Sequence, residues 1–150
     1  MKRLLALCLL FVFAISAPAS AEELMMTRVM QSFPETMLKL QEVIKQHGYQ
    51  LSRVQRVDIG LANMGYKTDK YRVVFFGKEK QNRWIIAHHP ELIAYLPLKV
   101  AIYAEEEDTL LVSPNLEILI AAKDPKLKKI VEGWQHDLQN MFREMHDYDG

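Results

Sequence analysis

Two adjacent histidines, His88 and His89, are the residues of this chain whose type best suits binding chemistry. Imidazole nitrogen binds copper, zinc and haem iron, and thioether sulfur suits copper and haem. The chain holds five histidines and eight methionines, so both kinds of ligand are present. Neighbouring residues on a helix point about 100° apart, whereas two ligands of one ion usually stand at i and i+4. Their residue type makes His88 and His89 candidate metal or haem ligands. Their adjacent spacing makes a solvated helix end the simpler interpretation.

Residues for covalent catalysis are scarce in this chain. Its single cysteine is Cys8, and beyond residue 21 its serines are Ser32, Ser52 and Ser113. The sequence contains no nucleophile elbow, HExxH zinc motif, phosphate-binding loop or dinucleotide fingerprint. Ser32 and Ser113 stand where helix caps are expected, which is a structural use of serine. We therefore predict that the protein is not an enzyme, and we assign no catalytic residue.

The first 21 residues have the three parts of a secretory signal peptide. Lys2 and Arg3 form a basic start, and an apolar run of twelve residues follows over 4–15. Ala19 and Ala21 provide the small side chains that a signal peptidase recognises. Twelve residues at about 1.5 Å each cover about 18 Å, whereas the hydrocarbon of a bilayer is about 30 Å thick. We predict cleavage after Ala21 and export, with the periplasm of a bacterium as the destination.

Removal of the signal peptide changes what the amino-acid composition implies. The whole chain has 150 residues with 19 basic and 19 acidic side chains. Removal of residues 1–21 takes away Lys2, Arg3 and Cys8, which leaves 129 residues with 17 basic side chains, 19 acidic ones and no cysteine. A chain of this length buries a sizeable core without disulfides. We predict no nucleic-acid binding, because no basic excess remains, and no integral membrane segment, because no later apolar stretch is long enough.

Helix signals are clearest in two segments. In the segment 33–47, Ser32 and Glu35 have the spacing of a capping box, and Gly48 follows as the terminating residue. The segment 125–146 begins after Asp124-Pro125. Its apolar residues recur on one face, as in an amphipathic helix. They are Leu127, Ile130, Val131, Trp134, Leu138, Met141, Phe142 and Met145.

The remaining pattern predicts an α+β fold. Two apolar runs flank the acidic stretch 105–108, which is typical of a β-hairpin with a solvated tip. The expected strands are 24–30, 49–57 (with a bulge near Arg53-Val54), 71–76, 97–103 and 109–113, and the other expected helices are 79–88 and 114–122, with a loop over 58–70. Hairpin pairing favours an antiparallel or mixed sheet of four to five strands, with helices on one face and a long C-terminal amphipathic helix. We expect a single domain over 22–150.

The sequence resembles the DUF302 family over residues 24–122. The resemblance rests on the strand end Val73–Gly77, the strand start Leu96–Val100 and the helix start Ser32–Thr36, together with Pro90 between the first two and Pro114 after the hairpin. Membership implies a small α+β domain with an antiparallel sheet and no established activity. It also implies that the protein is often a homodimer.

Two positions depart from the pattern of that family. Many members have Asn-Pro after the Phe-Gly of the strand, where this chain has Lys78-Glu79. Many also have Asp-His before the central strand, where this chain has Asp58 followed by Ile59. A ligand role of that histidine therefore does not carry over. The segment beyond Asp124 lies outside the resemblance.

Taken together, these features predict a non-enzymatic module of the cell envelope that binds a small ligand or an envelope protein. The first alternative is a periplasmic metal or haem carrier that uses His88 or His89. The second is an envelope scaffold that associates through the apolar stripe of the segment 125–146. A homodimer is compatible with each of these functions.

Overall fold

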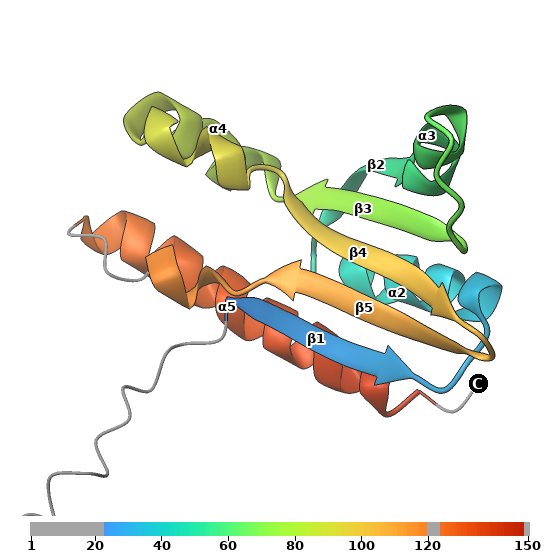
Figure 1. The fold of residues 1–150 in the computed structure, drawn as a ribbon. Coiled ribbons are helices and arrows are strands. Elements are labelled where there is room, and N and C mark those ends of the chain that lie inside the picture. The colour runs from blue at the N-terminus through green and yellow to red at the C-terminus, as the bar shows by residue number, and fades with distance from the viewer. Residues whose placement is uncertain (1–22, 120–123, 149–150) are drawn as a thin grey trace, which may run out of the picture.

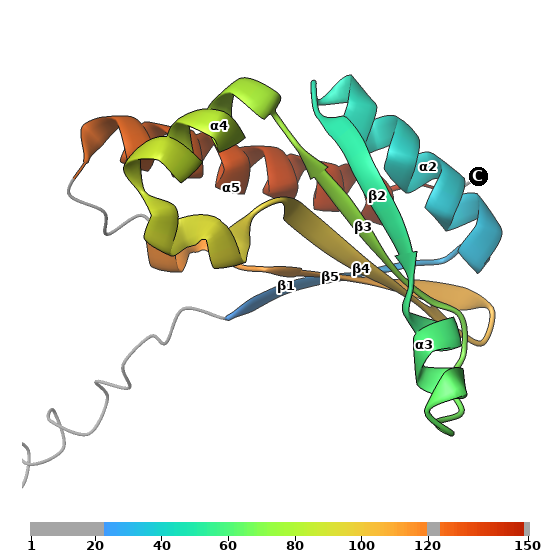
Figure 2. The same ribbon diagram turned by 90° about the horizontal axis from the view of Figure 1, so that it is seen from above.

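The computed structural model describes residues 23–119 and 124–148. Its centre is a five-stranded antiparallel sheet in the order β1-β5-β4-β3-β2 (Figure 1). The strands are β1 (Leu24–Val29), β2 (Gln50–Arg56), β3 (Tyr71–Gly77), β4 (Leu98–Glu105) and β5 (Asp108–Pro114). Two helices, α2 (Phe33–Gln46) and α5 (Pro125–His146), lie on the same face of this sheet (Figure 2). The predicted α+β class is therefore confirmed.

Smaller elements stand at the two ends of the β2–β3 pair. The helix α3 (Val57–Asn63) follows β2, and the helix α4 (Glu79–His88) follows β3 at the opposite end (Figure 1). The 3₁₀ helix η2 (Pro90–Tyr95) leads from α4 to β4, and η3 (Leu116–Leu119) follows β5. None of the described helices has the length and apolar character that a membrane crossing requires.

Helix α2 begins and ends where local signals place it. Gly48 has a φ of 78°, a left-handed conformation that glycine adopts at little cost. Ser32 acts differently from the expected capping box, because its hydroxyl donates to the Glu35 carboxylate (2.7 Å) and accepts no backbone N–H. On the inner face Leu40 and Ile44 are fully buried against the sheet.

The apolar stripe of α5 is buried within the chain itself. Leu127, Val131, Trp134, Leu138, Met141, Phe142 and Met145 belong to the hydrophobic core. The Asp124 carboxylate caps the helix by accepting from the N–H groups of Lys126 and Leu127. Because this stripe packs against its own sheet, most of its apolar surface is already covered within the chain, which counts against the scaffold alternative.

Two predicted segments differ from the structure. The expected loop 58–70 contains the helix α3, which is held to the sheet where the Arg72 guanidinium donates to the Asp58 carboxylate. The expected helix 114–122 is a short 3₁₀ helix in its described part. Pro114 instead ends β5, the short η3 follows, and residues 120–122 lie outside the described part of the chain.

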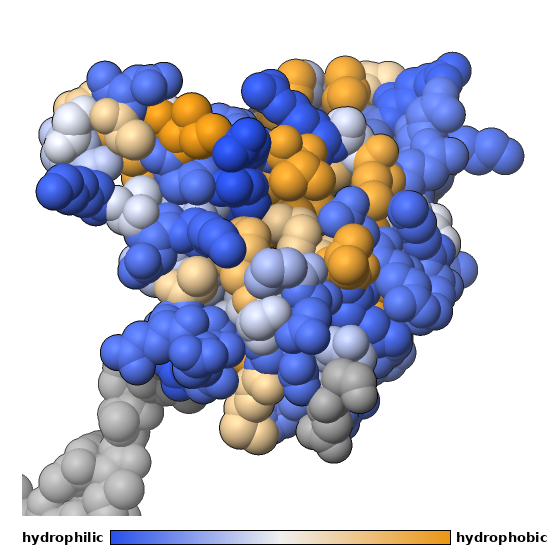
Figure 3. Space-filling model, turned by 90° about the vertical axis from the view of Figure 1, so that its right-hand side faces the viewer, coloured by the Kyte–Doolittle hydropathy of each residue, from blue (hydrophilic) through white to orange (hydrophobic). Residues whose placement is uncertain are grey.

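Within the described part of the chain, no helix covers one face of the sheet. The strand β3 has apolar residues on both of its sides, and α2 and α5 cover the side of Val74 and Phe76 (Figure 2). On the other side Tyr71 and Tyr103 pack edge to face, with ring centroids 6.1 Å apart. Cross-strand packing of this kind half-buries such residues without a second layer. Elsewhere, on the side drawn in Figure 3, hydrophobic patches alternate with hydrophilic side chains.

Candidate functional site

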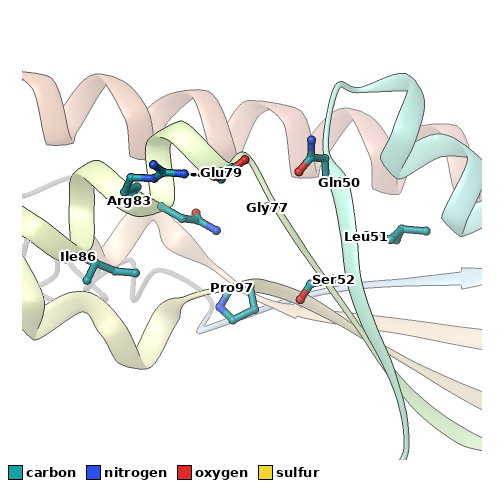
Figure 4. A pocket seen from close by; sticks show the side chains of 9 residues that line it. Gln50, Leu51, Ser52, Gly77, Glu79, Arg83, Ile86 and Pro97 are labelled. Atoms are coloured by element: carbon teal, nitrogen blue, oxygen red, sulfur yellow. Dashed lines mark hydrogen bonds and ion pairs between the residues drawn. The ribbon is translucent and has the colours of Figure 1, made fainter.

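A cleft of about 440 Å³ lies between the start of β2, the end of β3 and helix α4. Its volume falls within the roughly 300–1,000 Å³ that is usual for small-molecule sites. The lining residues are Gln50, Leu51, Ser52, Gly77, Glu79, Asn82, Arg83, Ile86 and Pro97 (Figure 4). Apolar and polar side chains share this lining, as in sites that enclose one part of a ligand and orient another.

The strand β2 turns its polar side chains toward the cleft through a β-bulge. Leu51 pairs with Phe76 and Arg53 pairs with Phe75, so Ser52 is an extra residue without a partner on β3. A bulge bends its strand and redirects side chains. Gln50 and Ser52 point toward Pro97 and α4, whereas Leu51 points the other way (Figure 4). The slip in alternation near Arg53 had predicted this bulge, which the register confirms.

Asn82, at the end of the first turn of α4, lines the cleft and carries a buried oxygen that lacks a partner. Among the described residues, its Oδ1 is the buried side-chain polar atom that lacks a hydrogen-bond partner. A Cβ built on Gly77 would lie only 2.4 Å from Asn82 Nδ2, so the amide occupies space that any other residue at position 77 would fill. Leaving a buried acceptor unpaired costs on the order of 1–3 kcal/mol. A donor from outside the chain, either water or a ligand, relieves that cost.

The rim of the cleft has one charged pair and an apolar patch. The Arg83 guanidinium donates to the Glu79 carboxylate one turn earlier on α4. Both side chains are largely exposed, which leaves them free to move when a ligand arrives. Ile86 is 48% exposed and faces Pro97 across the opening (Figure 4).

A clamp of three side chains holds the start of α4 against α5. The hydroxyl of Tyr49 donates to Asp137 Oδ2 (2.7 Å), and Lys78 Nζ donates to the same oxygen (3.0 Å). Lys78 Nζ also lies 4.2 Å from the centre of the Tyr49 ring. Burial, followed by the hydrogen bond to Asp137, raises the pKa of Tyr49 well above its ordinary value. The phenol therefore stays protonated and serves as a structural donor rather than as a base.

His88 and His89, the residues singled out from sequence, both make contacts at the far end of α4. His88 Nδ1 donates to the carbonyl oxygen of Trp84 (2.8 Å), and its ring stacks on that of Trp84. His89 lies between two carboxylates, with Nε2 3.1 Å from Asp124 Oδ2 and Nδ1 3.3 Å from Glu91 Oε1. Each ring nitrogen of His89 therefore faces a carboxylate oxygen, and the imidazole is held from both sides.

Hydrogen bonds at this corner favour the ionised form of Asp124. The N–H of Leu127, and after it His89, hold the pKa of the Asp124 carboxyl below its ordinary value. Lys126 Nζ lies 4.2 Å from the centre of the Trp84 ring, in a cation–π contact. Within the described residues, no group of three or more His, Cys, Asp or Glu side chains is arranged to hold a metal ion. The predicted cleavage residues Ala19 and Ala21 lie outside those residues.

The sequence did not single out the residues of the cleft. Gly77 was noted as the end of a strand, and a glycine after a buried run is a signal of close backbone approach. Nothing distinguished Asn82, Gln50 or Arg83 from ordinary surface positions, because their importance depends on what lies opposite them.

Comparison with known proteins now adds the family. Residues 25–145 match the model of a family described as "Domain of unknown function DUF302". The chain belongs to the DUF302 family. The matched range continues through most of α5, so the C-terminal helix is part of the DUF302 domain and not an addition to it.

Among solved structures, this DUF302 protein is similar to one described as "Crystal structure of uncharacterized conserved protein DUF302 from Bacillus stearothermophilus". The TM-score is 0.72 at 20% sequence identity, and the similarity covers 83% of this chain and 99% of the other. At that identity the likeness establishes the fold. No curated protein matches the sequence.

Proposed function

We propose that this DUF302 protein is a non-enzymatic binding module that holds a small amide-bearing molecule in the cleft between β2 and α4. The observation that carries the proposal is the buried Oδ1 of Asn82, which has no partner among the described residues. An amide ligand supplies the missing N–H donor, and its carbonyl oxygen accepts from Nδ2 of the same side chain. Two hydrogen bonds to one side chain would orient the ligand.

The rest of the cleft suits the remainder of such a molecule. Ile86 and Pro97 provide an apolar wall for an aliphatic group, and Gln50 and Ser52 provide polar contacts on the β2 side. Arg83 stands at the mouth, where it meets any negative charge that the ligand bears. The protonated phenol of Tyr49 and the chain's lack of cysteine beyond Cys8 supply no base and no thiol nucleophile, which favours binding over catalysis.

Export to the cell envelope belongs to the same proposal. It rests on the basic start at Lys2-Arg3, the apolar run 4–15 and the small residues Ala19 and Ala21. Amino-terminal sequencing of protein purified from the periplasm tests it. We expect a chain that begins at Glu22, and an intact Met1 in the cytoplasm contradicts export.

A pair of matched probes tests the cleft. Isovaleramide offers an N–H donor to Asn82 Oδ1, whereas methyl isovalerate has the same branched aliphatic group and no N–H at all. We expect the amide to shift the backbone resonances of Ser52, Gly77 and Arg83 in an NMR titration. One neutral hydrogen bond is worth about 1 kcal/mol, so the ester should bind several-fold more weakly.

Substitution of Asn82 completes the test. Asn82→Ala should remove the difference in affinity between the amide and the ester. Asn63→Ala, an exposed asparagine at the end of α3, is the matched control and should leave that difference unchanged. Equal affinity of the unaltered protein for the two probes, or no shift with either, refutes an amide site in this cleft.

A further inference from the structure

The helix α3 is rich in apolar residues and yet contributes none of them to the core. None of its residues is buried, although Val57, Ile59, Leu61 and Ala62 are apolar. A helix in a folded protein usually gains most of its stability from an apolar face that it buries. We call residues 57–70, which comprise α3 and the segment that leads to β3, the α3 lobe. The helix of this lobe stands out from the end of the β2–β3 pair, away from α2 (Figure 2).

An ordered turn at the end of α3 presents two exposed apolar side chains. The Tyr66 N–H donates to the Leu61 carbonyl oxygen (3.0 Å), and the Gly65 N–H donates to that of Ala62 (3.0 Å). Gly65 has a φ of 86°, so these two bonds complete a Schellman motif. The motif fixes the backbone on which Met64 (66% exposed) and Tyr66 (64% exposed) stand. Their exposure therefore comes from a defined backbone turn.

Cationic side chains flank the α3 lobe on both sides along the chain. Residues 53–72 contain five cationic side chains and two carboxylates, whereas the whole chain has equal numbers of each. One of the two carboxylates, that of Asp58, is engaged by Arg72. Among the described residues, Arg53 and Lys67 form no ion pair. The five cations are Arg53, Arg56, Lys67, Lys70 and Arg72.

The acidic stretch 105–108 lies at the same end of the sheet, but it stands apart from α3 (Figure 1). It forms the turn between β4 and β5, and the Glu105 carboxylate accepts from Arg28 of β1 (2.7 Å). The lobe instead projects from the opposite edge, which β2 forms. An anionic surface can therefore meet the lobe while the acidic turn stays in water.

We propose that the α3 lobe docks on the surface of an anionic lipid bilayer. The Tyr66 ring sits at the level of the head groups, Met64 and Ile59 (40% exposed) enter the boundary with the acyl chains, and the flanking cations meet lipid phosphates. A protein partner fits less well, because lysine is depleted at protein interfaces and two lysines, Lys67 and Lys70, stand beside this apolar tip.

Such docking leaves the ligand cleft open. The cleft lies at the start of β2, at Gln50–Ser52, whereas α3 follows the end of that strand. A molecule that rests on a bilayer through the α3 lobe therefore keeps the cleft accessible from water. The docking does not rest on the proposed amide site and goes beyond it.

Co-sedimentation of the purified protein with lipid vesicles tests the proposal. We expect binding to vesicles that contain phosphatidylglycerol, and much weaker binding to vesicles of phosphatidylcholine alone. Added salt should weaken the binding, because it screens the attraction between exposed charges. All variants keep the same amino terminus, so any contribution of the apolar run 4–15 is common to them.

Variants of the apolar tip have a matched control. Met64→Ser and Tyr66→Ser should each weaken binding to the anionic vesicles by about fivefold or more, because each removes apolar surface that enters the bilayer. Met26→Ser, at a similarly exposed methionine (63%) on the opposite edge strand β1, should leave the binding unchanged.

Variants of the charges separate the lobe from other lysines. Lys67→Gln should weaken the binding by about fivefold. Lys129→Gln, at an exposed lysine of α5, should not change it. All four of these altered side chains are exposed, so the far-ultraviolet spectra should match that of the unaltered protein. Equal binding to the two kinds of vesicle, no binding to either, or equal losses in lobe and control variants overturns the proposal without affecting the ligand cleft.

Discussion

The two edge strands of this sheet are built differently. β2 has a bulge at Ser52 and exposed side chains at Arg53 and Arg56, which guard an edge against another strand. β1 is regular over all six of its pairs with β5, and Met26 on it is exposed and apolar. The irregular edge borders the cleft in which we propose that a small molecule binds, whereas the regular edge keeps an uninterrupted register.

The supports of the two edges differ as well. Beside β1, the long helix α5 presses its apolar stripe against the sheet. Beside β2, the shorter helix α4 buries only Ile85 in the core. Polar contacts add to its support, in which Trp134 Nε1 donates to Gln81 (2.7 Å) and Lys78 donates to Asp137 (3.0 Å). Burial of a large apolar side chain contributes more to the free energy of unfolding than one hydrogen bond does. Substitutions in the apolar stripe of α5 should therefore cost more stability than substitutions around the start of α4.

The largest effect should come from the support of β1. Leu138, on α5, is 1% exposed, and Leu138→Ala leaves a cavity in the core. We expect a loss of about 2–5 kcal/mol in the free energy of unfolding, measured by urea denaturation. Leu38→Ala, at a leucine of α2 that is 71% exposed, is the control and should stay within about 0.5 kcal/mol of the unaltered protein. Similar losses in both variants would mean that α5 is not the main support.

A smaller effect should come from the cleft side. Gly77→Ala places a Cβ 2.4 Å from Asn82 Nδ2, so the amide must rotate away. We expect a loss of about 1 kcal/mol in stability and of the preference for the amide probe. Gly133→Ala is the matched control, because a Cβ on Gly133 meets nothing within 4 Å. A helical glycine replaced in open space should instead raise stability by about 0.5–1 kcal/mol.

The pair Gly77 and Asn82 also allows a double variant. Gly77→Ala combined with Asn82→Ala should regain the stability lost in Gly77→Ala, because the side chain that meets the new Cβ is shortened. If the double variant instead loses as much stability as the two single variants together, the two residues do not compete for the same space.

The smallest effect should appear only with pH. The hydrogen bond from Arg72 holds the pKa of Asp58 below its ordinary value. A lowered pKa in the folded state stabilises it above the ordinary pKa of about 4, and this stabilisation is lost as the pH falls through the lowered value. We expect Asp58→Asn to cost about 1 kcal/mol at neutral pH and nothing in strong acid. Glu107→Gln, in the hairpin turn, is the control; a difference that persists in acid contradicts the assignment.

Local signals were enough to predict most elements of this fold. Gly48 marks the end of α2, and Asp124-Pro125 marks the start of α5, because caps act through backbone groups a few residues away. The acidic stretch 105–108 contains the hairpin turn between β4 and β5, as predicted. The helix α3 was missed because Gly60 and Asn63 disfavour a helix locally, whereas the contact of Asp58 with Arg72 comes from a strand later in the chain.

Neither candidate binding surface could be read from the chain. His88 and His89 stood out by residue type, yet the structure engages them with Trp84, Glu91 and Asp124. Asn82 did not stand out, because an asparagine becomes significant only when its partners are known to be missing.

The amino-acid sequence by itself determined the fold class of this protein and which faces of its two main helices are apolar. Hydrophobic periodicity and helix caps depend on residues within a few positions of one another, so they can be recognised without any knowledge of the fold. Tertiary structure alone decided which strands lie at the edges and which polar atoms are left unpaired. Those properties depend on strand order, which brings residues such as Glu23 and Asn115 together from opposite ends of the chain.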